Sequence, residues 1–243
     1  MDTALLAPEF DPMGTAIFDY YTHGKADKLR VFSSQFEEDE MPVKQLFRSY
    51  KEMSEIEKTA LLAAKGRILD VGAGSGCHSL ALQEMGKDVY AIDISPLAVK
   101  TMQMRGINEV SHMNLFSPQF TEKFDTILML MNGTGIIGNL LSMPLFFEKM
   151  KQLLNENGSI ILDSTDLRYL FEEEDGSFTI DLTDNYYGEI DFSMQYKKIK
   201  GQSFDWLYID FQSLSLYASE NGFKAKMLKE GTHYDYLTAL SLR

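Results

Sequence analysis

Three glycines alternate with small residues at 72–76 (Gly-Ala-Gly-Ser-Gly), directly after an apolar run that contains an acidic residue, Asp70. Glycines allow the main chain to turn tightly and to approach a ligand without an intervening side chain. The helix expected to follow them would direct its unpaired N–H groups and its partial positive charge towards that ligand. The segment 67–78 (RILDVGAGSGCH) therefore predicts a site for a nucleotide-like molecule or a carboxylate.

Two other kinds of glycine-rich loop compete with this interpretation. A phosphate-binding P-loop requires a lysine followed by serine or threonine, and the segment 67–78 contains no lysine. A dinucleotide-binding loop requires the order G-x-G-x-x-G, which would place its third glycine at position 77, where this chain has Cys77. Because Gly76 comes one residue too early for that pattern, the spacing argues against an NAD site.

A second acidic residue, Asp93, ends the next apolar run, DVYAID. It lies about twenty residues beyond the glycines, where a carboxylate can accept hydrogen bonds from the two hydroxyls of a ribose. NAD sites use the same arrangement, so Asp93 supports a nucleotide-like ligand without identifying it.

The order Asp70, Gly72, Gly74, Gly76, followed by Asp93, resembles the first two stations of class I S-adenosylmethionine-dependent methyltransferases. The resemblance covers roughly residues 60–165 and continues through FDTILMLMNG and NENGSIILD. It implies that S-adenosylmethionine is the cofactor and that the loop holds its amino-acid end. Asp70 would orient the ammonium group, directly or through water.

The resemblance also implies which residues surround the rest of the cofactor. Asp93 would bind the ribose, and Asn114 would contact the adenine at a position where many members carry aspartate. The residues expected to bind the cofactor are Asp70, Gly72, Ala73, Gly74, Gly76, Asp93, Ile94, Asn114, Leu115 and Met131.

No sequence motif identifies the residues that would act on a methyl acceptor. Methyl transfer from a sulfonium is an in-line displacement that mainly needs alignment and exclusion of water, with a base only for a protonated acceptor. Ligands bind beyond the carboxyl ends of parallel strands, which makes Asn132, Asp163 and Asp166 the candidate catalytic residues. Asn132 is equally well explained as a turn residue, and the two aspartates as a helix cap followed by a loop. Arg48 is expected to be exposed, or to extend along apolar surface with its charged end in water, with a cofactor carboxylate as its alternative partner.

Apolar runs and helical patterns alternate along the chain and would bring these residues together. The runs RILDVG, DVYAID, EVSHMNLF, FDTILMLMN and SIILDST alternate with helical patterns at 76–85, 96–105 and 144–154. This alternation predicts an α/β fold with a doubly wound, mostly parallel sheet covered by helices on both faces. The terminal runs KAKML and YDYLTALSL fit the antiparallel last strand of the seven-stranded sheet in the family that the chain resembles.

We expect one methyltransferase domain over residues 1–243, without internal repeats. An amphipathic pattern predicts a single helix over 42–64, and a turn at Lys200-Gly201 predicts a β-hairpin inserted after the fifth strand. The expected parts are an N-terminal helical cap (1–64), a cofactor-binding core (65–170), the inserted hairpin (171–210), and a last helix with a terminal strand pair (211–243).

Composition narrows the range of partners. With 23 basic and 36 acidic residues, the formal net charge is −13, which argues against nucleic acids and anionic membranes as partners. Cys77 is the only cysteine and no two histidines have metal-ligand spacing, so we expect neither a disulfide nor a metal. No secretory signal and no run of about 18 apolar residues is visible, so a cytoplasmic monomer or homodimer is expected.

The sequence therefore predicts an S-adenosylmethionine-dependent methyltransferase that acts on a small-molecule acceptor. A non-catalytic S-adenosylmethionine-binding or regulatory protein is the main alternative, because methyl transfer requires no obligatory catalytic residue. An NAD-dependent oxidoreductase is a weaker alternative, because the glycine spacing disfavours it.

Overall fold

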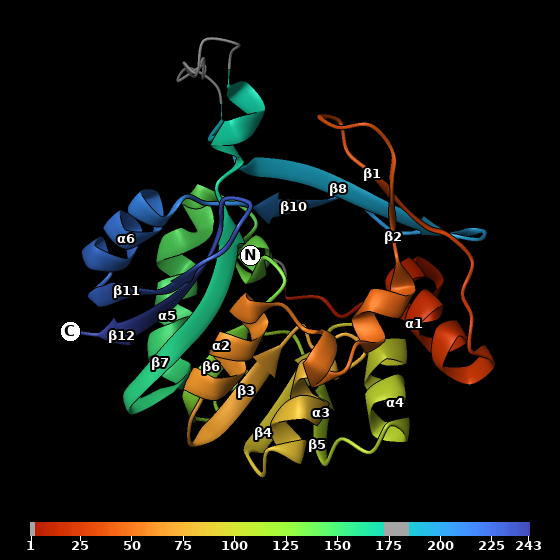
Figure 1. Cartoon of the computed structure of the whole chain (residues 1–243), viewed down its shortest axis with the longest axis horizontal. Helices are drawn as coiled ribbons and strands as arrows, with labels where there is room; N and C mark the ends of the chain where they lie inside the picture. Colours follow the sequence, from red (N-terminus) through yellow and green to blue (C-terminus); the bar gives the residue numbers. More distant parts are fainter. Residues whose placement is uncertain (1–2, 173–184) are drawn as a thin grey trace.

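The computed structural model of the chain describes residues 3–172 and 185–243. Its main feature is a seven-stranded sheet in the order β11-β12-β7-β6-β3-β4-β5 (Figure 1). The strands from β5 to β7 pair in parallel, and β12 pairs antiparallel with both β7 and β11. This confirms the expected sheet with its antiparallel last strand. The strands are β3 (Arg67–Val71), β4 (Asp88–Asp93), β5 (Glu109–His112), β6 (Phe124–Met129), β7 (Leu154–Thr165), β11 (Phe223–Glu230) and β12 (Asp235–Leu242).

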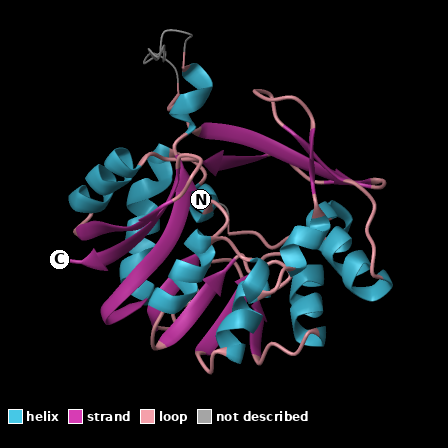
Figure 2. Cartoon of the chain, viewed as in Figure 1, coloured by secondary structure: helices cyan, strands magenta, loops and turns pink. Residues whose placement is uncertain are grey.

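Helices cover both faces of this sheet (Figure 2). Two successive residues of β6 point to the two faces of the sheet. Ile127 packs in the cluster that includes α5 and α6, and Leu128 packs in the cluster that includes α2 and α3. None of the helices within the two described ranges is long and apolar enough to cross a membrane. The helices are α1 (Pro12–His23), α2 (Glu55–Ala63), α3 (Cys77–Glu84), α4 (Pro96–Met104), α5 (Met143–Leu153) and α6 (Phe211–Glu220).

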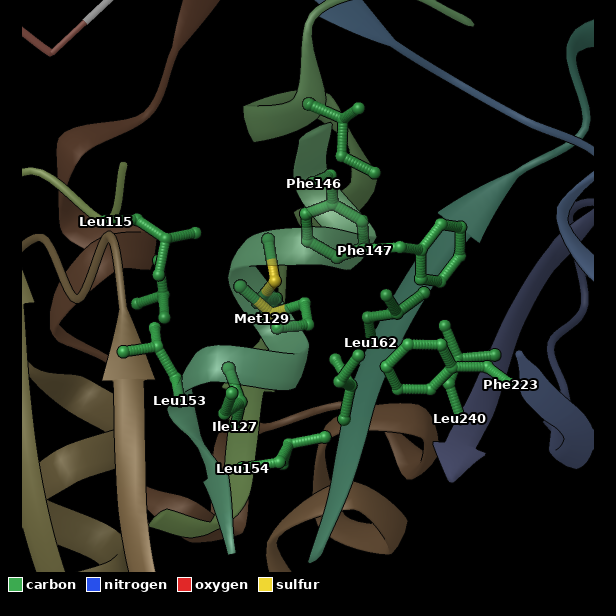
Figure 3. Close-up of a cluster of buried hydrophobic side chains, with 14 of the residues drawn as sticks. Leu115, Ile127, Met129, Phe146, Phe147, Leu153, Leu154, Leu162, Phe223 and Leu240 are labelled. Carbon is green, nitrogen blue, oxygen red and sulfur yellow. The ribbon is translucent and has the colours of Figure 1, made fainter. Parts of the chain in front are cut away.

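The largest cluster of buried side chains lies between the sheet and α5 (Figure 3). Phe147 of α5 is fully buried there, with its ring centroid 5.2 Å from that of Phe146 and 5.1 Å from that of Phe223. Burial of such side chains is the main favourable term in folding, so this cluster holds the sheet and its covering helices in register.

A second, smaller sheet has the order β10-β8-β1-β2, and β9 pairs with β8 at one end. The expected hairpin is present as the antiparallel pair of β8 and β10, but β8 also pairs with β1 from the N-terminal part of the chain. Residues 173–184 of the expected insertion lie outside the described residues. The strands of this sheet are β1 (Leu29–Phe32), β2 (Asp39–Met41), β8 (Glu189–Tyr196), β9 (Ile199–Lys200) and β10 (Phe204–Leu207).

The N-terminal part is therefore not a purely helical cap, because β1 and β2 lie within it. Leu29 and Tyr196 face each other across β1 and β8 and are fully buried with Ala16 of α1, so a tertiary contact decides the structure here. The expected turn at Lys200-Gly201 is also wrong. The chain turns at Lys197, which has a positive φ of 53°, and the Gly201 N–H continues the pairing by donating to the Met194 carbonyl at 2.9 Å.

The single helix expected over 42–64 is likewise wrong. The structure has two short 3₁₀ segments, η2 (Val43–Phe47) and η3 (Tyr50–Glu52), before α2 begins. Ser49 and Ser54 each form a capping box, with Glu52 and Glu57 respectively. Glu52 and Glu57 accept hydrogen bonds from the N–H groups of Ser49 and Ser54, and the Ser54 hydroxyl accepts one from the Glu57 N–H. A new helical segment therefore starts after each serine, where the apolar spacing alone indicates one helix.

Phe147→Ala should lower the free energy of unfolding by about 3–5 kcal/mol, because it leaves a cavity in the largest buried cluster. Leu145→Ala is the matched control, since Leu145 belongs to the same helix but is 53% exposed. Urea unfolding followed by circular dichroism measures both variants, and equal losses would contradict the assignment of Phe147 to the core.

Candidate functional site

The glycine loop follows β3 and has the geometry that only glycine adopts easily. Gly72, Gly74 and Gly76 have positive φ angles of 65°, 57° and 80°. The N–H groups of Gly72 and Ala73 both donate to the carbonyl of Ile92 in β4, at 3.0 and 3.1 Å. The loop is thereby attached to the carboxyl ends of β3 and β4, and Gly76 begins α3 as its N-cap.

Asp93 lies beside this loop at the end of β4. One carboxylate oxygen accepts a hydrogen bond from the Gly74 N–H and the other from the Ser95 N–H, both at 2.8 Å. Burial raises the pKa of Asp93 to about 6, although these two hydrogen bonds oppose the shift. Because each carboxylate oxygen has a second lone pair, the group can still accept hydrogen bonds from a pair of ligand hydroxyls.

The other predicted cofactor residues differ in exposure. We call the edge of the large sheet at which its parallel strands end the carboxyl edge. Asp70 is 2% exposed and accepts a hydrogen bond from the Ser79 hydroxyl at 2.6 Å, and Leu115 is 3% exposed within the core. Ile94 and Met131 are 37% and 38% exposed. Asp70 and Leu115 therefore lie beneath the edge, whereas Ile94 and Met131 present apolar surface at it.

Asn114 has a partner that the sequence did not suggest. Its side-chain oxygen accepts a hydrogen bond from the Phe116 N–H, and its side-chain nitrogen donates to the Ala4 carbonyl, both at 2.9 Å. Nearby, the Leu6 N–H donates to the Ile94 carbonyl at 3.0 Å. The first described residues of the chain therefore lie along the part of the edge that the resemblance assigns to the adenine.

On the other side of the loop, the structure brings Asn132 and Asp163 together. Met131 and Asn132 follow β6 and have positive φ angles of 68° and 56°. The Thr165 hydroxyl donates to the Asn132 side-chain oxygen at 2.7 Å, and Asp163 accepts from the Gly133 N–H at 3.0 Å. Burial raises the pKa of Asp163 to about 6.

Asp166, the third candidate, has a different environment. It is the N-cap of η6 (Leu167–Phe171) and accepts hydrogen bonds from the Arg168 N–H at 2.9 Å and the Tyr187 hydroxyl at 2.8 Å. Its second oxygen is 2.8 Å from the Arg168 guanidinium. These contacts match the helix-cap interpretation and separate Asp166 from the pair formed by Asn132 and Asp163.

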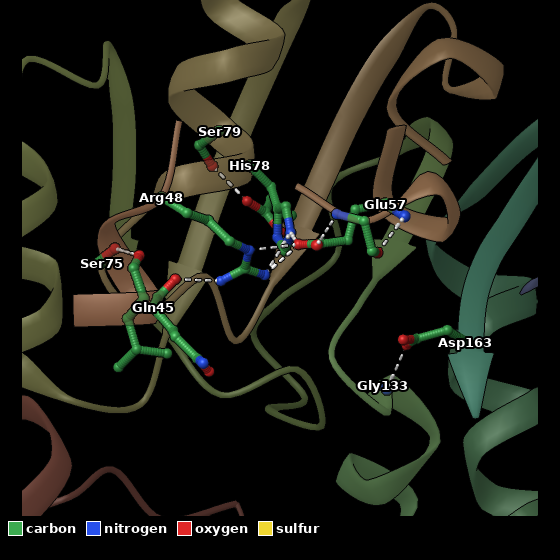
Figure 4. Close-up of polar contacts among 11 residues, drawn as sticks. Gln45, Arg48, Glu57, Ser75, His78, Ser79, Gly133 and Asp163 are labelled. Atoms are coloured by element: carbon green, nitrogen blue, oxygen red, sulfur yellow. Dashed lines mark hydrogen bonds and ion pairs between the residues drawn. The ribbon is translucent and has the colours of Figure 1, made fainter. Parts of the chain in front are cut away.

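A largely buried polar cluster of Arg48, Glu57 and His78 also lies next to the loop (Figure 4). Glu57 is 2.9 Å from the Arg48 Nε and 2.7 Å from the His78 Nε2. Burial raises the pKa of Glu57, but the hydrogen bonds from His78 and Arg48 outweigh it and bring the pKa to about 2. The expectation of an Arg48 with its charged end in water is wrong, because the guanidinium pairs with Glu57 and the side chain is 13% exposed.

The position of Glu57 in this cluster could have been predicted from the sequence. The spacing of Ser54 and Glu57 is that of a capping box, which predicts that Glu57 turns back towards the start of α2. Nothing in the sequence indicates that Arg48 and His78 meet it there. Within residues 3–172 and 185–243, no group of three or more His, Cys, Asp or Glu side chains could hold a metal ion.

These features together define what the carboxyl edge can bind. It offers a glycine loop that a ligand can approach closely, the N-terminus of α3 without a side-chain cap, a fixed carboxylate at Asp93, and apolar surface at Ile94 and Met131. A nucleoside that carries a polar or charged tail fits this set of donors, acceptors and apolar groups.

Comparisons with known proteins agree with this geometry. A family model described as a methyltransferase domain matches residues 43–243. A crystal structure from Bacteroides fragilis is 66% identical to this chain, with a TM-score of 0.95, and the match covers 100% of this chain and 99% of that one. It is described as an S-adenosylmethionine-dependent methyltransferase in complex with S-adenosyl-L-homocysteine.

Two further proteins are more distantly similar. A protein from Staphylococcus carnosus named an uncharacterized methyltransferase is 28% identical over 197 residues, which is 67% of this chain and 84% of that protein. A structure from Pyrococcus horikoshii OT3 has 20% identity and a TM-score of 0.58, covering 80% of this chain and 92% of that one. The latter is a likeness of fold alone.

The raised pKa of Asp163 predicts how stability depends on pH. The folded state holds this proton more tightly than the unfolded state, so the group's contribution to stability is full below pH ~4 and is lost as pH rises through about 6. Asp163→Asn removes this loss. The variant should exceed the unaltered protein by about 3 kcal/mol in free energy of unfolding at pH 8, and by little at pH ~4.

Asp88→Asn is the control for this prediction, because Asp88 is an exposed acid at the start of β4. Urea unfolding at a series of pH values measures both variants. A gain for Asp163→Asn that stays constant from pH 4 to pH 8 would show that the buried charge is not its cause.

Proposed function

We propose that this chain, which belongs to the methyltransferase-domain family, methylates a small-molecule acceptor. S-adenosylmethionine is the methyl donor. When bound, this cofactor supplies a methyl group on a sulfonium, which a lone pair of the acceptor takes by in-line displacement. The residues of the chain have to bind both molecules, align them and exclude water.

The carboxyl edge of the large sheet supports this cofactor. The positive end of α3 suits a carboxylate, and the glycine loop lets a ligand approach the main chain closely, so we assign the amino-acid end to Gly72–Gly76. Asp93 would accept the ribose hydroxyls, and the exposed side chain of Ile94 would pack on the adenine. Met131 would lie near the sulfonium, at the end of β6.

The second sheet supports a small acceptor rather than a polymer. Figure 1 shows β8 crossing over the carboxyl edge of the large sheet. At one end, Trp206 of β10 packs so closely on Gly135 of η4 (Gly133–Ile137) that a side chain at Gly135 would collide with the indole. At the other end, Tyr196 is fully buried against α1. A sheet attached at both ends limits the size of a molecule that can approach the edge beneath it.

One face of β8 would contact that acceptor. Successive residues of a strand point to opposite faces, so Ile190, Phe192, Met194 and Tyr196 share a face. Ile190 and Tyr196 at its ends are buried, whereas Phe192 and Met194 between them are only partly buried. We therefore assign Phe192, in the middle of this face, to acceptor binding.

Asn132 and Asp163 are the residues best placed to handle the acceptor's reacting group. Asp163 carries a negative charge at neutral pH and can bind a cationic group or take a proton from an acceptor that arrives protonated. Asn132, held by Thr165, can orient a nitrogen or an oxygen. We assign no step to Asp166, whose carboxylate is engaged by Arg168 and Tyr187.

A direct assay separates this function from a non-catalytic binding role. The purified protein is incubated with S-adenosylmethionine and a panel of small amines, hydroxyl compounds and thiols, and release of S-adenosylhomocysteine is measured. Release that depends on one class of compound supports the proposal and identifies the acceptor. Binding of the cofactor without release for any class would favour the regulatory alternative.

S-adenosylhomocysteine should bind the protein and raise its melting temperature, whereas NAD should not. Asp93→Ala should weaken binding of S-adenosylhomocysteine by about 1.5–3 kcal/mol, the range for hydrogen bonds to a charged group. Isothermal titration calorimetry measures the affinity, with Asp88→Ala as the control because Asp88 is an exposed acid at the opposite end of β4. Equal stabilisation by NAD, or unchanged affinity of Asp93→Ala, would contradict this assignment.

Phe192→Ala should raise the acceptor KM by about tenfold and leave the affinity for S-adenosylhomocysteine within about twofold, because it removes apolar surface only from the acceptor side. Ser193→Ala is the matched control, since Ser193 is the next residue of β8 and points to the opposite face. Steady-state kinetics with the acceptor found in the panel measures both variants. An unchanged KM for Phe192→Ala would place acceptor binding elsewhere.

A further inference from the structure

The N-caps of α1 and α4 are joined by a hydrogen bond next to the ribose-binding residue. Asp11 is fully buried and caps α1 by accepting from the Gly14 N–H at 2.8 Å. Its second oxygen accepts from the Ser95 hydroxyl at 2.6 Å. The same serine caps α4 by accepting from the Ala98 N–H at 2.9 Å. A side chain at Gly14 would collide with both Ser95 and Asp11, so the two helix ends fit closely.

Ser95 also extends this connection to the cofactor edge. Its N–H donates to one oxygen of Asp93, and the Gly74 N–H donates to the other oxygen. A continuous chain of hydrogen bonds therefore runs from Asp11 through Ser95 and Asp93 to the glycine loop. The orientation of the Asp93 carboxylate depends on where Ser95 is held, and Asp11 helps to hold it.

The residues before Asp11 follow the same edge. We call residues 4–11 the N-terminal arm. The Ala4 carbonyl accepts from the Asn114 side chain at 2.9 Å, and the Leu6 N–H donates to the Ile94 carbonyl at 3.0 Å. The arm thus contacts the two residues assigned to the adenine, and it ends at the residue that holds Ser95.

We propose that the N-terminal arm is a working part of the cofactor site, with Asp11 acting through Ser95 as a positioning residue for the ribose-binding carboxylate of Asp93. This inference rests on the proposed function, because it presumes that Asp93 binds the ribose. A carboxylate held in advance by its neighbours loses less freedom when it binds a ligand. Because coupling between two equilibria is reciprocal, the bound cofactor must in turn stabilise the arm.

Asp11→Ser is the central variant, because serine caps a helix about as well as aspartate but is too short to replace both oxygens. It should weaken binding of S-adenosylhomocysteine by about five- to tenfold, as should Ser95→Ala. In the double variant, the loss should not exceed that of the larger single change, because both remove the same hydrogen bond. Calorimetry measures affinity, and urea unfolding measures stability separately.

Asp210→Ser is the matched control. Asp210 is also an N-cap, of α6, and its carboxylate also accepts a hydrogen bond from a side-chain hydroxyl, that of Tyr186 at 2.8 Å. This substitution changes the same chemistry at another helix, and the affinity for S-adenosylhomocysteine should stay within about twofold of the unaltered protein.

A second ligand tests whether a loss of affinity comes from the position of Asp93 or from a general loss of structure. The 2′,3′-dideoxy analogue of S-adenosylhomocysteine lacks the hydroxyls that Asp93 would accept. If Asp11 acts through Asp93, Asp11→Ser should weaken binding of this analogue by less than about twofold. Hydrogen exchange should also show slower exchange of the Leu6 amide when S-adenosylhomocysteine is bound, with a smaller effect in Asp11→Ser.

The outcomes are distinct. If the unaltered protein binds S-adenosylhomocysteine but Asp11→Ser binds it equally well, or loses affinity equally for the dideoxy analogue, the arm does not position Asp93 and the proposed function stands. If the unaltered protein fails to bind S-adenosylhomocysteine, the proposed function is overturned together with this inference.

Discussion

The Asp93 carboxylate accepts one main-chain hydrogen bond on each oxygen, from Gly74 on one side and from Ser95 on the other. These N–H groups belong to the turns that follow β3 and β4, which are neighbours in the large sheet. The carboxylate therefore ties together the two turns that form the carboxyl edge. Because burial raises its pKa to about 6, an ionised Asp93 needs fixed donors in place of water. The glycine loop, the start of α4 and the N-terminal arm all depend on how this one group is satisfied.

Three acidic residues with raised pKa values lie along the same edge. Burial raises the pKa values of Asp70, Asp93 and Asp163, so their ionised forms cost stability in the folded protein. Arg48 lies close by, but Glu57 takes up its charge within a buried ion pair. Such an edge attracts cations, and S-adenosylmethionine carries both a sulfonium and an ammonium group. The cost of burying these acids is consistent with a site that is organised for a cationic ligand before the ligand arrives.

The second sheet shows how segments that are far apart in sequence build one side of a site. β1 and β2 come from the N-terminal part of the chain, and β8 and β10 from the segment that follows the large sheet's fifth parallel strand. The pairing of Leu29 with Tyr196 joins the two and is buried against α1. β1 and β2 have only four and three residues, and tertiary contacts such as this one stabilise them. Local patterns in residues 1–64 therefore indicate helices alone.

The sequence by itself determined the large sheet and the position of the cofactor edge. Strands that are covered on both faces must be apolar throughout, and turns with positive φ need glycine, so Gly72, Gly74, Gly76 and the acids Asp70 and Asp93 can be recognised from residue type and spacing. Only the tertiary structure decided the rest: that Arg48 forms an ion pair with Glu57, that β1 pairs with β8, and that the N-terminal arm reaches the site. The last two join segments that are separated by long stretches of chain, and the first joins side chains nine residues apart in different helical segments. Local periodicity carries no record of such contacts, because their energy comes from burial and hydrogen bonding that exist only once the chain has folded.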